Sequence, residues 1–211
     1  MSSIRNIIFD FGNVLFDLNL GAFSREMQQM LGGEFAAARA ALQREKIFEQ
    51  YETGGLSTEE FLEKICSTSG NTLSPQQVEA AWNAIFIGMP ARRFEMLLRL
   101  RQQYKVFLLS NINELHERWI DAYMLREHRL EDYQFPYFDG VYFSHLIRLR
   151  KPEPDIYEYV LADAELNPAE TLFFDDLPEN VEAARRVGIQ GIWHEPGTEI
   201  EERLLGLGLF R

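Results

Sequence analysis

Residues 4–13, IRNIIFDFGN, pass from a short apolar run into a polar turn that contains a glycine. This pattern is typical of a buried β-strand that ends at Asp10. Four later segments are similarly short and apolar, namely residues 105–109, 141–144, 171–174 and 189–193. Segments of helical character follow strands of this kind, and the alternation indicates a parallel sheet covered by helices on both faces. The sequence therefore predicts a three-layer α/β fold.

A second pattern occupies residues 18–90, where helical spacing dominates and no strand is expected. Residues 36–51 and 74–87 show this spacing most clearly. An all-helical block that follows the first strand cannot belong to the sheet. We therefore expect a small all-helical cap domain at residues 18–90, inserted into a core domain of residues 1–17 and 91–211.

Three details refine the expected cap. Ser57 opens a Ser-Thr-Glu-Glu run that is typical of a helix N-terminus. Residues 113–137 are long for a loop, and their aromatic and charged side chains favour helical turns near the cap. Aromatic residues also recur at helix-like intervals, and we expect them to pack inside the cap rather than to bind a sugar: Phe48, Tyr51, Phe61, Trp82 and Phe86.

Composition narrows the possible partners. The 211 residues include 33 acidic and 21 basic side chains, and the net charge of -12 disfavours nucleic acid and anionic membranes. A small anionic substrate is still compatible with this charge, because a bound divalent cation reverses the local potential. Cys66 is the only cysteine and no long apolar stretch occurs, so we expect a soluble, cytoplasmic protein without disulfides. The oligomeric state is left open.

Polar side chains stand at the ends of the predicted strands. Ligands of open parallel sheets bind beyond the carboxyl ends of the strands, so these side chains should share one crevice. They are Asp10, Ser110, Asn111, Lys151, Asp175 and Asp176. Carboxylate oxygens suit Mg²⁺, and Asp10 and Asp176 are the natural pair of ligands. With the metal bound, Asp10 could attack phosphorus, while Ser110 and Lys151 would stabilise the phosphoryl group.

Four ordered motifs carry a family resemblance. FDFGNVL at residues 9–15, LSN at 109–111, RKP at 150–152 and FDD at 174–176 resemble the motifs of the haloacid dehalogenase superfamily. Two further segments, YETGGLS at 51–57 and SNINELH at 110–116, look most like the bacterial alpha-glucose-1-phosphatase subgroup.

The resemblance implies a Rossmann-like core and a Mg²⁺-dependent phosphatase that acts on a small phosphorylated metabolite. It also implies that the backbone carbonyl of Gly12 binds the metal together with Asp10 and Asp176. Asp175 and Asn180 would orient this acidic loop without binding the metal themselves. Phosphate would be bound by Gly12, Asn13, Ser110, Asn111 and Lys151.

Gly12 departs from the pattern of the resemblance. Most phosphatases of the superfamily have a second Asp two residues after the nucleophile, which protonates the leaving group, and general acid catalysis is typically worth about 100- to 10,000-fold. Three explanations are open: the leaving group needs little protonation, a cap residue such as Glu52 supplies the proton, or the activity is low. Relatives in the glucose-1-phosphatase subgroup resemble this sequence in having glycine there.

Two other functions compete with the phosphatase hypothesis. A 2-haloacid dehalogenase would attack carbon with Asp10 and would tolerate Gly12, but it needs no metal and therefore no acidic pair such as Asp175 and Asp176. A non-catalytic protein could retain the pocket to sense a phosphometabolite, although the intact Asp10 favours catalysis.

Overall fold

The computed structural model describes residues 4–209, so residues 1–3 and 210–211 of the predicted core lie outside the described part. A five-stranded sheet with the order β5-β4-β1-β6-β7 forms the centre, and all of its neighbouring strands are parallel. Its strands are β1 (Asn6–Phe9), β4 (Lys105–Ser110), β5 (Gly140–Phe143), β6 (Thr171–Asp175) and β7 (Gln190–Trp193). The predicted parallel sheet and its strand segments are confirmed.

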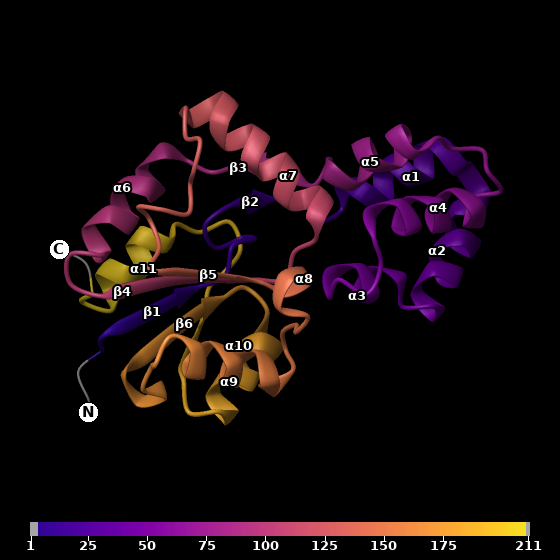
Figure 1. Cartoon of the computed structure of the whole chain (residues 1–211). Helices are drawn as coiled ribbons and strands as arrows, with labels where there is room; N and C mark the ends of the chain where they lie inside the picture. Colours follow the sequence, from indigo (N-terminus) through magenta and orange to yellow (C-terminus); the bar gives the residue numbers. More distant parts are fainter. Residues whose placement is uncertain (1–3, 210–211) are drawn as a thin grey trace.

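Helices cover both faces of the sheet, because alternate side chains of the buried strands face opposite ways. In β1, Ile7 and Phe9 join one apolar cluster, whereas Ile8 joins the other. The first cluster includes residues of α6 (Ala91–Leu100), α7 (Glu114–Tyr123) and α11 (Ile200–Gly206). The second includes residues of α9 (Pro154–Asp163) and α10 (Pro178–Arg186). This is the expected three-layer α/β architecture (Figure 1).

Five helices form a separate lobe with an apolar core of its own. They are α1 (Ala22–Leu31), α2 (Phe35–Arg44), α3 (Ile47–Glu52), α4 (Thr58–Thr68) and α5 (Pro75–Asn83), with a short 3-10 turn at Gly32–Glu34. Figure 1 shows the lobe beside the sheet. The predicted N-terminus at Ser57 is confirmed, since Ser57 and Glu60 form reciprocal hydrogen bonds at the start of α4.

The helical spacing of residues 36–51 is confirmed, and Lys46, with a left-handed backbone (φ 53°), separates α2 from α3. One expectation for residues 18–90 was wrong. Strands occur at the base of the lobe, where β2 (Asp17–Leu18) pairs antiparallel with β3 (Phe86–Gly88). These strands are too short to give a periodic signal, and they pair because the chain enters and leaves the lobe side by side. The exact domain boundaries stay a prediction.

Helix α7 links the lobe to the sheet. Leu115 at its start belongs to the apolar cluster of the lobe, whereas Ile120 belongs to the main core. The helix continues into a π-helical turn at Met124–His128, which confirms the helical turns expected after residue 113. The remaining short elements are α8 (Ser144–Ile147) and the 3-10 turn Pro168–Glu170. Across residues 4–209, every helix is too short or too polar to cross a bilayer.

Candidate active site

Lys151 lies where β1, β4 and β6 end. Its side chain is 1% exposed, and its ammonium Nζ contacts the carboxylates of Asp10 and Asp175, each at 2.7 Å. The same group donates to the Leu109 carbonyl oxygen at 3.0 Å, so its three N–H donors are matched by three acceptors. Burial lowers the pKa of Lys151, but the two carboxylates outweigh that effect and hold the pKa above its usual value. Lys151 is therefore a fixed positive charge beside Asp10.

Asp175 is fully buried and is engaged from several sides. Besides Lys151, it accepts hydrogen bonds from the backbone N–H of Leu177 (2.9 Å) and from the side-chain amide of Asn180 (2.9 and 3.1 Å). Asn180 lies in the first turn of α10, directly after the acidic loop. The structure thus brings Asp175 and Asn180 together beside the pocket, which Asn180 also lines.

Asp10, Asp175 and Asp176 gather their carboxylates at one point, with one oxygen of each within 4.8 Å of the others. Burial raises the pKa of Asp10 to about 7, Lys151 opposes this rise, and the neighbouring carboxylates add to it. Burial also raises the pKa of Asp176. One ammonium cannot offset three carboxylates, and hard oxygen donors of this kind fit Mg²⁺. Since Asp175 is engaged by Lys151 and Asn180, Asp10 and Asp176 are the members suited to hold the ion.

The remaining predicted residues border the same site. Asn13 has a left-handed backbone (φ 55°), and its side-chain amide donates to Asp176 at 3.0 Å. Ser110 ends β4 and is buried. The Asn111 side chain bonds both the backbone N–H and the carbonyl of Lys151, each at 2.9 Å. The Asn111 side chain is therefore used to position Lys151, a partner that the sequence did not reveal.

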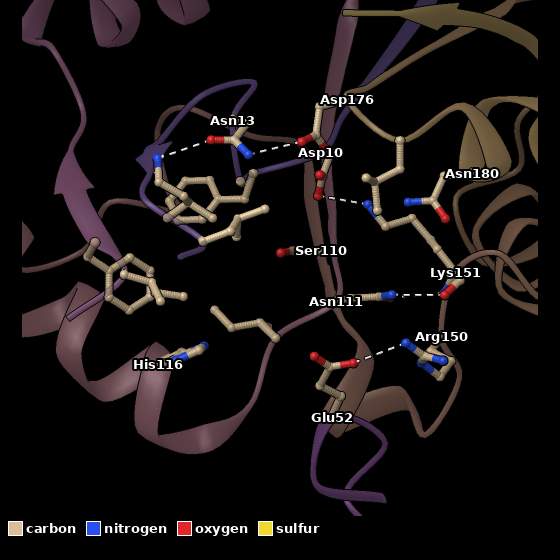
Figure 2. A pocket seen from close by; sticks show the side chains of 18 of the residues that line it. Asp10, Asn13, Glu52, Ser110, Asn111, His116, Arg150, Lys151, Asp176 and Asn180 are labelled. Atoms are coloured by element: carbon tan, nitrogen blue, oxygen red, sulfur yellow. Dashed lines mark hydrogen bonds and ion pairs between the residues drawn. The ribbon is translucent and has the colours of Figure 1, made fainter. Parts of the chain in front are cut away.

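A pocket of about 260 Å³ opens over these groups. Ser110 lines its polar end together with Asp10, Lys151 and Asp176 (Figure 2). Gly12 is also among the residues that line the pocket. Its other walls include residues from the lobe, from its two short strands and from α7: Leu18, Leu20, Glu52, Ile85, Phe86, His116 and Ile120.

Comparison with known proteins identifies the family. Residues 4–188 match the haloacid dehalogenase-like hydrolase family. The chain is a haloacid dehalogenase-like hydrolase. This hydrolase is 30% identical over 206 residues to a D-ribitol-5-phosphate phosphatase of Bacteroides thetaiotaomicron, with 95% of this chain and 97% of the relative covered. It is 29% identical to a sesquiterpene phosphatase of Aspergillus oryzae, with 90% of each chain covered.

A solved structure of a similar protein supports membership of the same family. A haloacid dehalogenase family enzyme of Bacteroides thetaiotaomicron, in complex with magnesium and inorganic phosphate, matches the hydrolase with a TM-score of 0.83 and 30% identity. The match covers 95% of this chain and 99% of the other. Because these relatives carry other names, the resemblance to the alpha-glucose-1-phosphatase subgroup stays a prediction.

Sequence reasoning missed part of the pocket of this hydrolase. Phe86 was expected inside the cap, but it lines the pocket and stacks on Trp119 with ring centroids 4.5 Å apart. His116 and Arg150 also line the pocket, although neither had been predicted as a site residue. Arg150 contacts Glu52 of the lobe at 3.2 Å. Its place next to Lys151 in the RKP motif was the available signal, but its partner depends on how the lobe docks.

Proposed function

We propose that this hydrolase is a Mg²⁺-dependent phosphatase that acts on a small phosphomonoester and uses Asp10 as the nucleophile. The observation that carries the proposal is the meeting of the Asp10 and Asp176 carboxylates, within 4.8 Å of each other, beside the buried Lys151 ammonium. The phosphatase relatives and the solved structure with magnesium and phosphate support the same activity. A sugar or polyol phosphate is the first substrate to test.

Each polar group has a defined task in the proposed reaction. Asp10 attacks phosphorus, so that its bond to phosphorus forms as the bond to the leaving oxygen breaks, and that oxygen takes up a proton from solvent water to leave as the alcohol. Lys151 offsets negative charge on the nucleophile and on the transferred group, and Ser110 donates to a phosphoryl oxygen. Water then attacks phosphorus, which releases phosphate and restores the Asp10 carboxylate. Mg²⁺, held by Asp10, Asp176 and the Gly12 carbonyl, would reduce the repulsion between carboxylate and phosphate.

The two competing functions fit the site less well. A haloacid dehalogenase would leave the clustered carboxylates of Asp175 and Asp176 without a use, because displacement of halide needs no cation. A binding protein would need phosphate ligands but no aligned nucleophile, whereas Lys151 holds Asp10 at 2.7 Å.

A phosphate-release screen tests the proposal. Sugar phosphates, polyol phosphates, nucleotides and acyl phosphates are offered with Mg²⁺ and, separately, with a chelator. We expect turnover with Mg²⁺ only, and a loss of at least about 1,000-fold in Asp10→Asn, since removal of a nucleophile costs most of the catalysis. Chelator-insensitive halide release from a 2-haloacid, or full turnover by Asp10→Asn, would overturn the proposal.

A further inference from the structure

Away from the end of the pocket that would bind phosphate, the described lining residues include one pair of charged side chains. Among the described residues that line it, those with charged side chains are Asp10, Glu52, Arg150, Lys151 and Asp176. Three of these five form the proposed phosphate and metal site, so Glu52 and Arg150 remain. Their side chains contact each other at 3.2 Å, and their charges cancel. This half of the pocket therefore offers one acceptor and one donor group without net charge.

The rest of this half is apolar. Its side chains include Leu18, Leu20, Ile85, Phe86, Ile112 and Ile120. His116 also faces the pocket, but one of its ring nitrogens lies 3.1 Å from the Asn113 amide and the other 3.2 Å from the Trp82 carbonyl. Both nitrogens thus have partners inside the protein. A leaving group would meet a carbon-lined wall on one side and the Glu52 and Arg150 pair on the other.

The chain around Glu52 is fixed against the core. The Ser144 hydroxyl donates to the Glu52 carbonyl oxygen at 2.6 Å. Two residues later, Gly54 has a φ of 64°, and a Cβ there would lie 2.4 Å from the His145 carbonyl oxygen. In Figure 2, one carboxylate oxygen of Glu52 meets Arg150, while the other turns toward the middle of the pocket. Glu52 therefore presents an acceptor to the leaving group from a constrained position.

We infer that Glu52, held by Arg150, selects the leaving group by accepting a hydrogen bond from a hydroxyl on its carbon skeleton. The inference rests on the proposed phosphatase function. It assigns the substrate to phosphomonoesters of small, uncharged polyhydroxy alcohols, whose hydroxyls meet the ion pair and whose C–H face meets the apolar wall. A second charged group would either disrupt the ion pair of Glu52 and Arg150 or face apolar side chains without a counterion. The volume of about 260 Å³ lies slightly below the usual range of small-ligand pockets, which favours a small leaving group.

Glu52→Gln is the test, with Glu49→Gln as the matched control. Glu49 lies on the same helix and approaches Arg150 at 3.9 Å, yet it does not line the pocket. Each variant is assayed with a polyol phosphate and with the unsubstituted alkyl phosphate of the same carbon number. We expect Glu52→Gln to lower the ratio of the two kcat/KM values by roughly 10-fold or more, through loss of a charge-assisted hydrogen bond. Glu49→Gln should leave the ratio unchanged.

Other outcomes have separate meanings. An equal loss with both substrates would overturn the inference, because it would mark Glu52 as a structural contact. A loss that grows with the pKa of the leaving alcohol, whether or not hydroxyls are present, would also overturn it, because Glu52 would then be the proton donor. If the wild-type protein hydrolyses no phosphomonoester at all, the proposed function fails, and the inference that rests on it is overturned with it.

Discussion

Gly12 stands two residues after Asp10, at the position where the family resemblance led us to expect a second carboxylate. A Cβ added to Gly12 would lie 2.7 Å from Leu18 Cδ1, the flexible end of a side chain that lines the pocket. Leu18 thus fills space that a proton-donating side chain would need. The turn therefore has no carboxylate at position 12, and the apolar side chain of Leu18 occupies the adjacent space.

Gly12→Asp is expected to speed the hydrolysis of substrates with poor leaving groups by up to about 100-fold, the low end of general acid catalysis. Substrates with good leaving groups should change little, because they need no proton. The dependence of kcat on the pKa of the leaving group measures this effect. Gly12→Ala is the control, since it displaces Leu18 without adding a carboxylate. An unchanged dependence in Gly12→Asp would mean that another residue already transfers the proton.

His116 gives a pH dependence to stability. Burial lowers its pKa to about 4, and its Nδ1 faces the Asn113 amide, so a second ring proton has no acceptor there. The folded chain thus binds fewer protons at this residue than the unfolded chain between about pH 4 and 6.5. The stability from neutral His116 is complete at pH 7 and falls as the pH drops through that window, by about 2 kcal/mol at pH 5.

Denaturant unfolding at pH 7 and pH 5 measures this effect. We expect the free energy of unfolding of the wild-type protein to fall more between these pH values than that of His116→Gln, which lacks the titrating ring. Carboxylates elsewhere contribute equally to both proteins, so the difference isolates His116. Parallel pH profiles of the two proteins would contradict the prediction.

The sequence predicted which polar side chains gather at the carboxyl end of the sheet, because each follows a strand with a clear apolar signal. Asp10, Ser110 and Asp175 stand at strand ends and Lys151 follows the fourth strand, whereas the chemical roles of these residues stay a prediction. The partner of the Asn111 side chain could not be predicted, since it lies 40 residues away at Lys151. The roles of Arg150 and Phe86 were missed because the contacts of both residues depend on how the lobe docks against the sheet.

At the scale of elements, the turn between α3 and α4 packs against α8 and holds the lobe residue Glu52 at the pocket. A methyl group at Gly54 would collide with the backbone of α8 at His145, which cannot move as a flexible side chain can. Gly54→Ala should therefore displace Glu52 and lower kcat/KM for a polyol phosphate by about 10-fold or more.

Gly70→Ala provides the control for Gly54→Ala. Gly70 has nearly the same φ (66°) and lies in the same lobe, but nothing stands within 4 Å of the position of its Cβ. It therefore carries the same backbone strain without the collision. Equal losses of activity in the two variants would show that strain, and not the contact at His145, is responsible.

Element lengths explain which parts of the fold could be predicted. The three central strands β1, β4 and β6 are buried almost throughout and four to six residues long, so their apolar runs are visible in the sequence. The strands β2 and β3 have two and three residues and pair only because the chain returns beside itself. The break between α2 and α3 at Lys46 is invisible in apolar spacing, because a single left-handed residue hardly disturbs the pattern.

At the scale of the whole molecule, one apolar core of the sheet and the apolar core of the lobe meet around the pocket. In the proposed reaction, the strand ends would supply the charged groups that act on phosphorus, while the lobe, its two short strands and α7 would supply the walls that contact the leaving group. Chemistry and selectivity would then depend on different parts of the chain. Changes at the lobe should alter which phosphomonoester is used, and changes at the strand ends should alter whether any is used.

The proposed reaction depends most on the transfer of a phosphoryl group to Asp10. The direct measurement is rapid acid quenching during turnover, followed by mass spectrometry of the peptide that contains Asp10. We predict a phosphoryl group on Asp10 when Mg²⁺ is present, and none with a chelator or in Asp10→Asn. Steady turnover with no phosphorylated peptide at any quench time, together with an active Asp10→Asn variant, would contradict the account.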